Sequence, residues 1–165
     1  MTRLGDRRAR AILLPVFIAV CLAIGWLGGV ATGSSRADWY ADLLKPPLNP
    51  PDRVFAPVWA ILYIFMAVAG WRLLILRNPC SNNSLRALFA AQLVLNGVWS
   101  FLFFGARSPL AGLVDILALW ACLLMLIRTA WVKDRVSGYL LAPYFLWVSF
   151  AAYLNAGIWW LNLSR

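Results

Sequence analysis

The chain has 165 residues, of which 63% are hydrophobic and only 13% are charged. A soluble domain is about half apolar and about a quarter charged, so this composition excludes an ordinary soluble domain. The formal net charge is +9, but the cations gather at the ends of apolar segments. We therefore expect membrane lipids as partners of these charges, and no nucleic acid.

The first apolar segment covers residues 11–31 and follows a basic start that contains Arg3, Arg7, Arg8 and Arg10. A cleaved signal peptide is the alternative, because it also begins with positive charge. The hydrophobic core of a signal peptide has about 7 to 15 residues and ends at a cleavage site, whereas this run is longer and leads into further apolar segments. We therefore expect a first transmembrane helix.

Four more apolar segments follow a polar connection that is rich in proline and aspartate. The connection covers residues 32–52, and the segments cover 54–76, 84–104, 109–131 and 137–161. A membrane-spanning helix needs about 20 apolar residues, whereas a barrel strand would show about 10 residues with strict alternation. The sequence predicts an all-α membrane protein, with residues 1–165 forming one domain built as a five-transmembrane-helix bundle. The short breaks predict that sequential helices are antiparallel neighbours.

The distribution of Lys and Arg predicts the orientation in the membrane. Five spans place ten of these residues on the side of the N-terminus: Arg3, Arg7, Arg8, Arg10, Arg72, Arg77, Arg86, Arg128, Lys133 and Arg135. The other side holds five: Arg36, Lys45, Arg53, Arg107 and Arg165. Because cytoplasmic loops are enriched in positive charge, we expect a cytoplasmic N-terminus and an external C-terminus in a bacterial cell membrane.

Tryptophan is frequent, with ten residues in the chain. Five lie near the ends of spans, where a belt of interfacial aromatic rings is expected: Trp26, Trp71, Trp131, Trp159 and Trp160. Four lie deeper: Trp59, Trp99, Trp120 and Trp147. At a rise of about 1.5 Å per residue, Trp59 lies roughly 8 Å, Asn96 and Asn155 roughly 10 Å, and Trp147 roughly 20 Å from the side of the long connection. We expect these groups to line one chamber that opens toward that connection.

Four polar side chains within the spans need partners, because polar groups are costly in hydrocarbon. Gln92 and Asn96 share one helix face at i and i+4, and Asp115 and Asn155 lie in the last two spans. For the amides two interpretations stay open, which are hydrogen bonding between helices and contact with a ligand. Asp115 is either neutral, paired with a residue such as Arg107, or part of a site.

The chain offers little for metal binding or acid-base catalysis. It has no histidine, and its three cysteines, Cys21, Cys80 and Cys122, do not have the spacing of metal ligands. Asp115 is the only acid within a predicted span. We therefore expect no metal site, no disulfide framework and no acid-base or nucleophile constellation.

Several motifs together carry a family resemblance. The run WYADLLKPPLNPP covers residues 39–51, and Phe55, Pro57, Trp59 and Tyr63 follow it. The third span contains QLVLN at 92–96 with Trp99, and the fifth contains PYFLW at 143–147 and YLN at 153–155. These motifs resemble those of the tryptophan-rich sensory protein or translocator protein family (TspO/MBR), which includes the peripheral-type benzodiazepine receptor. The resemblance covers the chain from about Ala11 to its C-terminus.

The resemblance implies that the proline-rich first loop caps a ligand pocket in the bundle. The family's ligands are protoporphyrin and related tetrapyrroles, with sterol and isoquinoline-type ligands for some members. Carried over to matching positions, the ligand-binding residues are Trp39, Tyr40, Pro46, Trp59, Asn96, Trp99, Trp147 and Ala151. Aromatic faces suit a flat macrocycle, the small Ala151 leaves room near Trp147, and Asn96 supplies an orienting polar contact. No cofactor is required, and porphyrin is the expected ligand.

The connection has features that suit a lid. It contains four prolines, Pro46, Pro47, Pro50 and Pro51. Because proline fixes φ and lacks an amide donor, such a loop loses less entropy and needs fewer hydrogen bonds when it becomes ordered. Three cations, Arg36, Lys45 and Arg53, either attract the propionates of a tetrapyrrole or anchor the loop to lipid headgroups.

Two further patterns concern sterols and dimers. The cholesterol pattern of animal members needs a tyrosine followed by Lys or Arg within about six residues. Tyr153 has no such cation before Arg165, so we do not expect this sterol site. Pairs of small residues at i and i+4, Gly25 with Gly29 and Ala87 with Ala91, serve either a homodimer or packing within the bundle.

We expect a membrane protein that binds tetrapyrroles as a sensor or regulator, or in porphyrin handling, without a chemical step. The alternative that the resemblance implies is light- and oxygen-dependent porphyrin degradation, with Trp59 and Trp147 beside the excited ring. Transport of porphyrin or sterol-like ligands is a third class, although five unrepeated spans do not fit a secondary transporter. Haem suits the chain less well than free-base porphyrin, because histidine is absent and Cys80 is expected on the opposite side.

Overall fold

The structure is a computed structural model that describes residues 2–36, 38–76 and 83–163. The elements in these ranges are helical: α1 Thr2–Arg36, α2 Trp39–Asp42, the 3-10 turn η1 Asp52–Val54, α3 Phe55–Trp71, α4 Asn83–Ser100, α5 Pro109–Lys133 and α6 Arg135–Leu161. The π-helical turns η2, Arg72–Leu76, and η3, Phe101–Gly105, extend α3 and α4. Five helices are long and apolar enough to cross a membrane. The predicted all-α membrane protein with five spans is confirmed.

The helix ends differ from the predicted bounds. The prediction used apolar residues, which mark the part of a helix inside the membrane, whereas backbone hydrogen bonding can continue beyond it. Helix α1 covers Thr2–Arg36, although the predicted span is 11–31. The predicted connection 32–52 is correspondingly shorter, and α2 forms one helical turn within it. The break that was expected at 133–135 contracts to Asp134 alone, which lies between α5 and α6.

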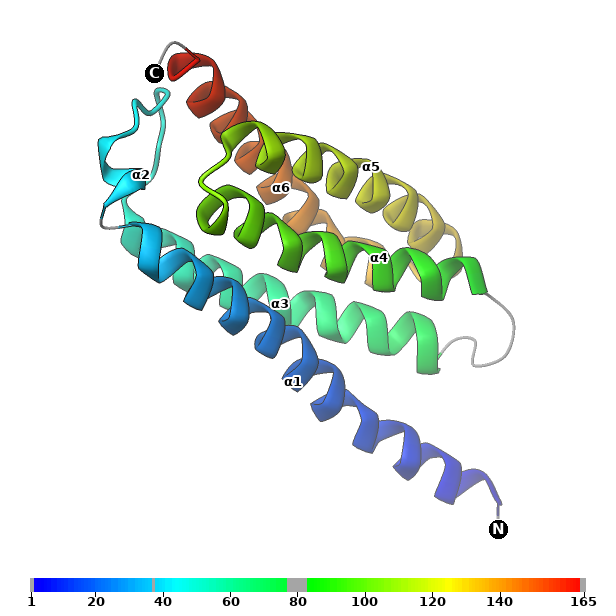
Figure 1. Cartoon of the computed structure of the whole chain (residues 1–165). Coiled ribbons are helices and arrows are strands. Elements are labelled where there is room, and N and C mark those ends of the chain that lie inside the picture. Colours follow the sequence, from blue (N-terminus) through cyan, green and yellow to red (C-terminus); the bar gives the residue numbers. More distant parts are fainter. Residues whose placement is uncertain (1, 37, 77–82, 164–165) are drawn as a thin grey trace.

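The five long helices close a ring in which α1 packs against α3, α3 against α6, α6 against α5, α5 against α4, and α4 against α1. Figure 1 shows α1 running beside α3, with its first turns projecting beyond the bundle and the two termini at opposite ends. The predicted contacts between sequential helices hold for most pairs. The exception is α3, which packs mainly against α1 and α6 rather than against α4, because α1 packs against both α3 and α4. The connection 77–82, which includes Cys80, lies outside the described residues.

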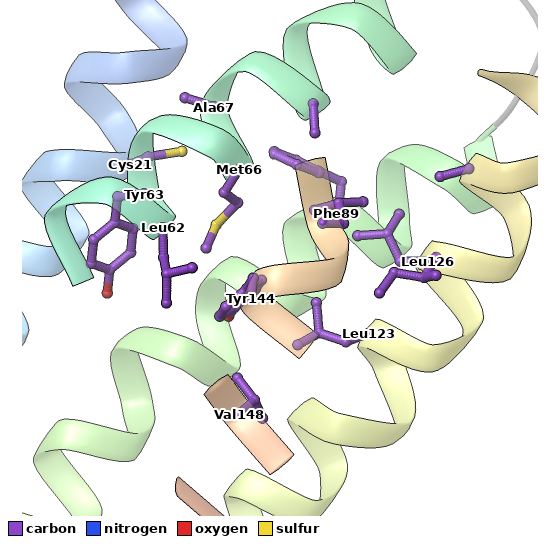
Figure 2. Packing of buried hydrophobic residues seen from close by; sticks show 14 of the residues in the cluster. Cys21, Leu62, Tyr63, Met66, Ala67, Phe89, Leu123, Leu126, Tyr144 and Val148 are labelled. Carbon is purple, nitrogen blue, oxygen red and sulfur yellow. The ribbon is translucent and has the colours of Figure 1, made fainter. Parts of the chain in front are cut away.

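Apolar side chains fill the half of the bundle that lies toward the N-terminal side of the membrane. Figure 2 shows side chains from all five long helices meeting there, among them Met66, Leu123 and Val148. These three are fully buried. The ring of Phe89 lies where a side chain at Gly70 would stand, so glycine is required at that crossing. This half of the bundle is therefore closely packed.

A hydrogen-bonded ion pair closes the same end. Arg72 donates from Nε to Asp134 Oδ2 at 2.8 Å and from Nη2 to Oδ1 at 3.0 Å. Ser137 Oγ also donates to Asp134 Oδ2, at 2.6 Å. The Asp134 side chain is 4% exposed and that of Arg72 is 19% exposed. These bonds tie the end of α3 to the turn between α5 and α6.

Candidate functional site

A cavity of about 360 Å³ lies in the opposite half of the bundle, near the segment that follows α2. Its size is within the range of about 300 to 1,000 Å³ that is usual for small-molecule pockets. The cavity is lined by Leu22, Gly25, Trp26, Gly28, Gly29, Thr32, Gly33, Tyr40, Asp52, Phe55, Ala56, Trp59, Ala60, Tyr63, Asn96, Trp99, Ser100, Phe103, Phe104, Trp147, Ala151, Leu154, Asn155 and Ile158. Four of the five long helices thus contribute, and α5 does not.

Aromatic rings from α3, α4 and α6 form much of the wall. The Trp59 ring lies 5.5 Å from that of Tyr63 and 6.1 Å from that of Tyr144, measured between centroids. Trp99 stacks on Phe103 at 5.2 Å. These ring contacts hold the aromatic side chains in place, and such a wall suits a flat apolar molecule.

Asn96 connects three helices at the inner end of the cavity. Tyr63 Oη donates to Asn96 Oδ1, and Asn96 Nδ2 donates to Tyr144 Oη at 2.8 Å. Tyr144 is fully buried and Asn96 is 4% exposed. Asn96 therefore forms hydrogen bonds between helices, which is the first of the two predicted interpretations. It also lines the cavity, where the second interpretation, contact with a ligand, would require it to be.

A second hydrogen-bonded group joins α4, α5 and α6. Trp99 Nε1 donates to Asn155 Oδ1 at 3.0 Å, and Asn155 Nδ2 donates to the Pro109 carbonyl at 2.7 Å. Asn155 is 1% exposed. Its amide is thus occupied by protein partners, which supports the structural interpretation at this position.

The indole nitrogens of two deep tryptophans differ in their partners. Trp120 Nε1 donates to Ser149 Oγ at 2.9 Å. Trp147 Nε1 is buried but has no hydrogen-bond partner among the described residues, and Trp147 lines the cavity. A buried N–H group without a partner is costly, so Trp147 carries an unmet hydrogen-bond donor next to the cavity.

Two other polar side chains within the spans lie away from the cavity lining. Gln92 is fully buried, and neither its Nε2 nor its Oε1 has a partner in the described part of the chain. Asp115 is 7% exposed, and its Oδ2 likewise has no partner among those residues, so the structure records no pairing of this oxygen with Arg107. Among the described residues, no group of three or more His, Cys, Asp or Glu side chains is placed to hold a metal ion.

Tyr40 covers the cavity at the end of the bundle. Its ring lies 6.2 Å from that of Phe103 and 5.5 Å from that of Phe104. Its hydroxyl donates to Asn49 Oδ1 at 3.3 Å. Lys45 Nζ lies 4.7 Å from the centroid of the same ring. The side chain of Arg36 lies outside the described part of the structure, so its predicted role stays a prediction.

The capping segment, which we define as residues 39–51, is fastened to α6. Asn162 pairs with the backbone of Leu44, accepting from its amide at 3.1 Å and donating to its carbonyl at 3.0 Å. Tyr153 Oη donates to the Pro47 carbonyl at 3.0 Å. Pro46 packs on Gly157, where an added Cβ would lie 2.7 Å from Pro46 Cβ. The segment is thus held at two points along α6 and at Asn162, which follows the helix.

The structure brings most of the sequence-predicted ligand residues to this cavity. Six of them line it: Tyr40, Trp59, Asn96, Trp99, Trp147 and Ala151. Trp39 and Pro46 do not line it. Trp39 instead packs on Phe103 at 5.6 Å, and Pro46 packs on α6, so both support the capping segment. Their contact with a ligand stays a prediction, as does ligand binding by the other six.

The contribution of α1 was not expected from the sequence. Trp26, which was assigned to the interfacial belt, is 69% exposed and also lines the cavity. Gly25, Gly28, Gly29 and Gly33 of the same helix line it as well. Gly25 and Gly29 are predicted from the sequence to serve either a homodimer or packing within the bundle, but glycines at helical spacing also leave open space beside a helix.

Comparison with known proteins agrees with the motifs. A profile of the TspO/MBR family matches residues 17–161. The chain is 42% identical to the tryptophan-rich protein TspO of Chlorobaculum tepidum, over 92% of this chain and 96% of that protein. It is 32% identical to protein CrtK of Rhodobacter capsulatus, over 91% and 92% of the two chains, and 36% identical to the translocator protein of Bos taurus, over 86% and 85%. With its five spans and its aromatic cavity, the chain belongs to the TspO/MBR family and is an integral membrane protein.

Proposed function

We propose that this protein binds a protoporphyrin-type tetrapyrrole in the cavity and acts as a membrane sensor or regulator, or in porphyrin handling, without a chemical step. The observation that carries the proposal is the aromatic lining of the cavity, which includes Trp147, a side chain whose buried N–H has no partner among the described residues. A flat apolar ligand with a hydrogen-bond acceptor at its edge fits these two features together.

The lining also favours a free-base ring over a metal-bearing one. It contains neither cysteine nor methionine, and the chain has no histidine. These three residue types are frequent axial ligands of haem iron; tyrosine is another, but the hydroxyls of the lining residues Tyr40 and Tyr63 are bonded to Asn49 and Asn96. Ligand binding would therefore depend on apolar contact and hydrogen bonding rather than on coordination.

The names of relatives support a sensing or translocating role. One relative, from Cereibacter sphaeroides, is named tryptophan-rich sensory protein and is 33% identical over 93% of this chain. The Bos taurus relative is named translocator protein. Neither name refers to catalysis.

The experiment is titration of purified protein in detergent with protoporphyrin IX, followed through the porphyrin absorbance band and through quenching of tryptophan fluorescence. We expect Tyr40→Ala, Asn96→Ala and Trp147→Ala to weaken binding. The control is Trp160→Ala, because this ring is 70% exposed and does not line the cavity. Equal affinity of the three variants and the wild type would exclude this cavity as the binding site.

Light- and oxygen-dependent porphyrin degradation is a second candidate, and one observation favours it. Trp59 lines the cavity with its ring next to those of Tyr63 and Tyr144, so oxidisable side chains form a chain beside the ligand position. The test is loss of porphyrin absorbance under illumination in air, compared among wild type, Trp59→Phe, Trp147→Phe and free porphyrin. The same rate in all four samples would exclude catalysis.

A further inference from the structure

The cavity continues into the seam between α1 and α3. On the α1 side it is lined by Leu22, Trp26, Gly29 and Gly33, and on the α3 side by Ala56 and Ala60. The spacing places Gly29 and Gly33 one and two turns after Gly25, and Gly25 packs directly on Tyr63 of α3. The two small-residue stripes therefore face each other along this seam.

The seam between α1 and α3 is closed near Ala67 and open near Ala56 and Ala60. Ala67, two turns after Ala60 on the same face of α3, is fully buried. Ala60 and Ala56 are exposed, as are Gly29 and Gly33. A Cβ added at Gly29 or at Gly33 would meet no atom within 4 Å. The cavity therefore reaches the outer surface of the bundle between these small residues, and Gly29 and Ala60 lie within membrane spans.

The residues around this opening suit hydrocarbon rather than water. Trp26 is 69% exposed and Leu22 is 39% exposed, and both line the cavity. Both belong to the membrane span Ile12–Val30. An apolar molecule that is dissolved in the bilayer thus meets an apolar entrance without passing through water.

The end of the cavity toward water lies beside the capping segment, where Tyr40 and the exposed Asp52 line it. Tyr40 lies over it, and the capping segment is held by the Asn162 pair with Leu44 and by the bond from Tyr153 to Pro47. Opening this end would break several hydrogen bonds at once, whereas no hydrogen bond between the side chains of α1 and α3 is recorded among the described residues.

We infer that the ligand enters and leaves laterally from the bilayer, through the seam between α1 and α3, and that the capping segment remains closed during exchange. The inference rests on the proposed function, because it assigns a route to the same cavity. The ligand class that it requires is a flat, apolar molecule that partitions into lipid.

The test uses the full chain in phosphatidylcholine vesicles with protoporphyrin IX as the probe, and measures association and dissociation rates by stopped-flow fluorescence. Gly29→Leu and Ala60→Leu each fill the seam, and two independent sites guard against one variant failing to fold. Ala118→Leu adds the same bulk at an exposed position of α5 and serves as the matched control. Asn162→Ala and Tyr153→Phe loosen the capping segment.

We expect each seam variant to lower both the association rate and the dissociation rate about tenfold, because added bulk in the path raises the barrier in both directions, whereas loss of ligand space in the cavity would raise the dissociation rate. The α5 control and the two capping-segment variants should exchange at the wild-type rates. Wild-type rates in both seam variants would overturn the lateral route, as would faster exchange when the capping segment is loosened. Absence of porphyrin binding by the wild type would instead overturn the proposed function itself.

Discussion

Asn96 shows how one polar residue inside the membrane serves several helices. It accepts from Tyr63 of α3 and donates to Tyr144 of α6. Polar groups within the membrane commonly form hydrogen bonds between helices, and here each of the three side chains has at least one such partner. The predicted need for a partner is therefore met, and the partners are two tyrosines that the sequence did not identify.

Replacing Asn96 with Leu should lower the free energy of unfolding by about 1 to 3 kcal/mol, because two buried hydroxyls lose their partner. Tyr144→Phe should cost about 1 kcal/mol, since it removes one hydrogen bond and keeps the ring. Unfolding by SDS in detergent micelles measures both. Tyr139→Phe is the control, because Tyr139 is 67% exposed; a loss as large in this variant would contradict the interpretation.

Phenylalanine variants of Trp120 and Trp147 should distinguish an effect on folding stability from an effect on porphyrin binding. Trp120→Phe loses the bond to Ser149 and should reduce stability by about 1 kcal/mol without affecting porphyrin affinity. Trp147→Phe loses no hydrogen bond within the described residues, so its stability should stay close to that of the wild type. Its porphyrin affinity should fall about fivefold, as expected for one hydrogen bond. The opposite pattern in paired unfolding and titration experiments would refute the assigned role of the Trp147 N–H.

At the scale of elements, α6 holds the capping segment through groups near its C-terminal end. Asn162 follows the helix and binds Leu44, while Gly157 accommodates Pro46. The contact explains why Pro46 acts in support of the segment rather than in the cavity wall. Proline restricts the segment in advance, and a few side-chain bonds then suffice to place it.

Gly157→Ala should displace the capping segment, because its Cβ would lie 2.7 Å from Pro46 Cβ. We expect faster cleavage of residues 39–51 by a protease added to the purified protein. Gly33→Ala is the matched control, since a Cβ there meets nothing within 4 Å. Equal cleavage of the two variants would show that the Pro46 contact does not hold the segment.

The ion pair of Arg72 and Asp134 should stabilise the closely packed end of the bundle. Arg72→Met removes two charge-assisted hydrogen bonds from a nearly buried carboxylate and should reduce stability by about 3 kcal/mol. Arg128→Met removes a charge from an exposed position of α5 and should change stability little. Comparable losses in SDS unfolding of the two variants would contradict a specific contribution from the pair.

At the scale of the whole molecule, five crossings put the termini on opposite sides, as Figure 1 shows for the two ends of the bundle. The closed ring places the cavity near the capping segment and the dense core near the Arg72 pair. In such an arrangement the half with the cavity can admit a ligand, while the tightly packed half maintains the fold.

The ten-to-five distribution of Lys and Arg predicts a cytoplasmic N-terminus. Alkaline phosphatase fused to the C-terminus in a bacterial host should therefore be active, and green fluorescent protein at the same position should be dark. Fluorescence from the C-terminal fusion would reverse the predicted orientation. Moving cations from the N-terminal side to the capping segment should lower phosphatase activity.

The sequence by itself determined the five helices and the family, because span length and local motifs are properties of neighbouring residues. It also predicted that Trp59, Asn96 and Trp147 share a chamber, since depth follows from helical rise alone. Only the tertiary structure decided that α1 separates α3 from α4, that Trp39 and Pro46 support the capping segment, and that glycines of α1 open the cavity toward lipid. Which face of a uniformly apolar helix points inward depends on its neighbours, and apolar periodicity is too weak in such helices to reveal it.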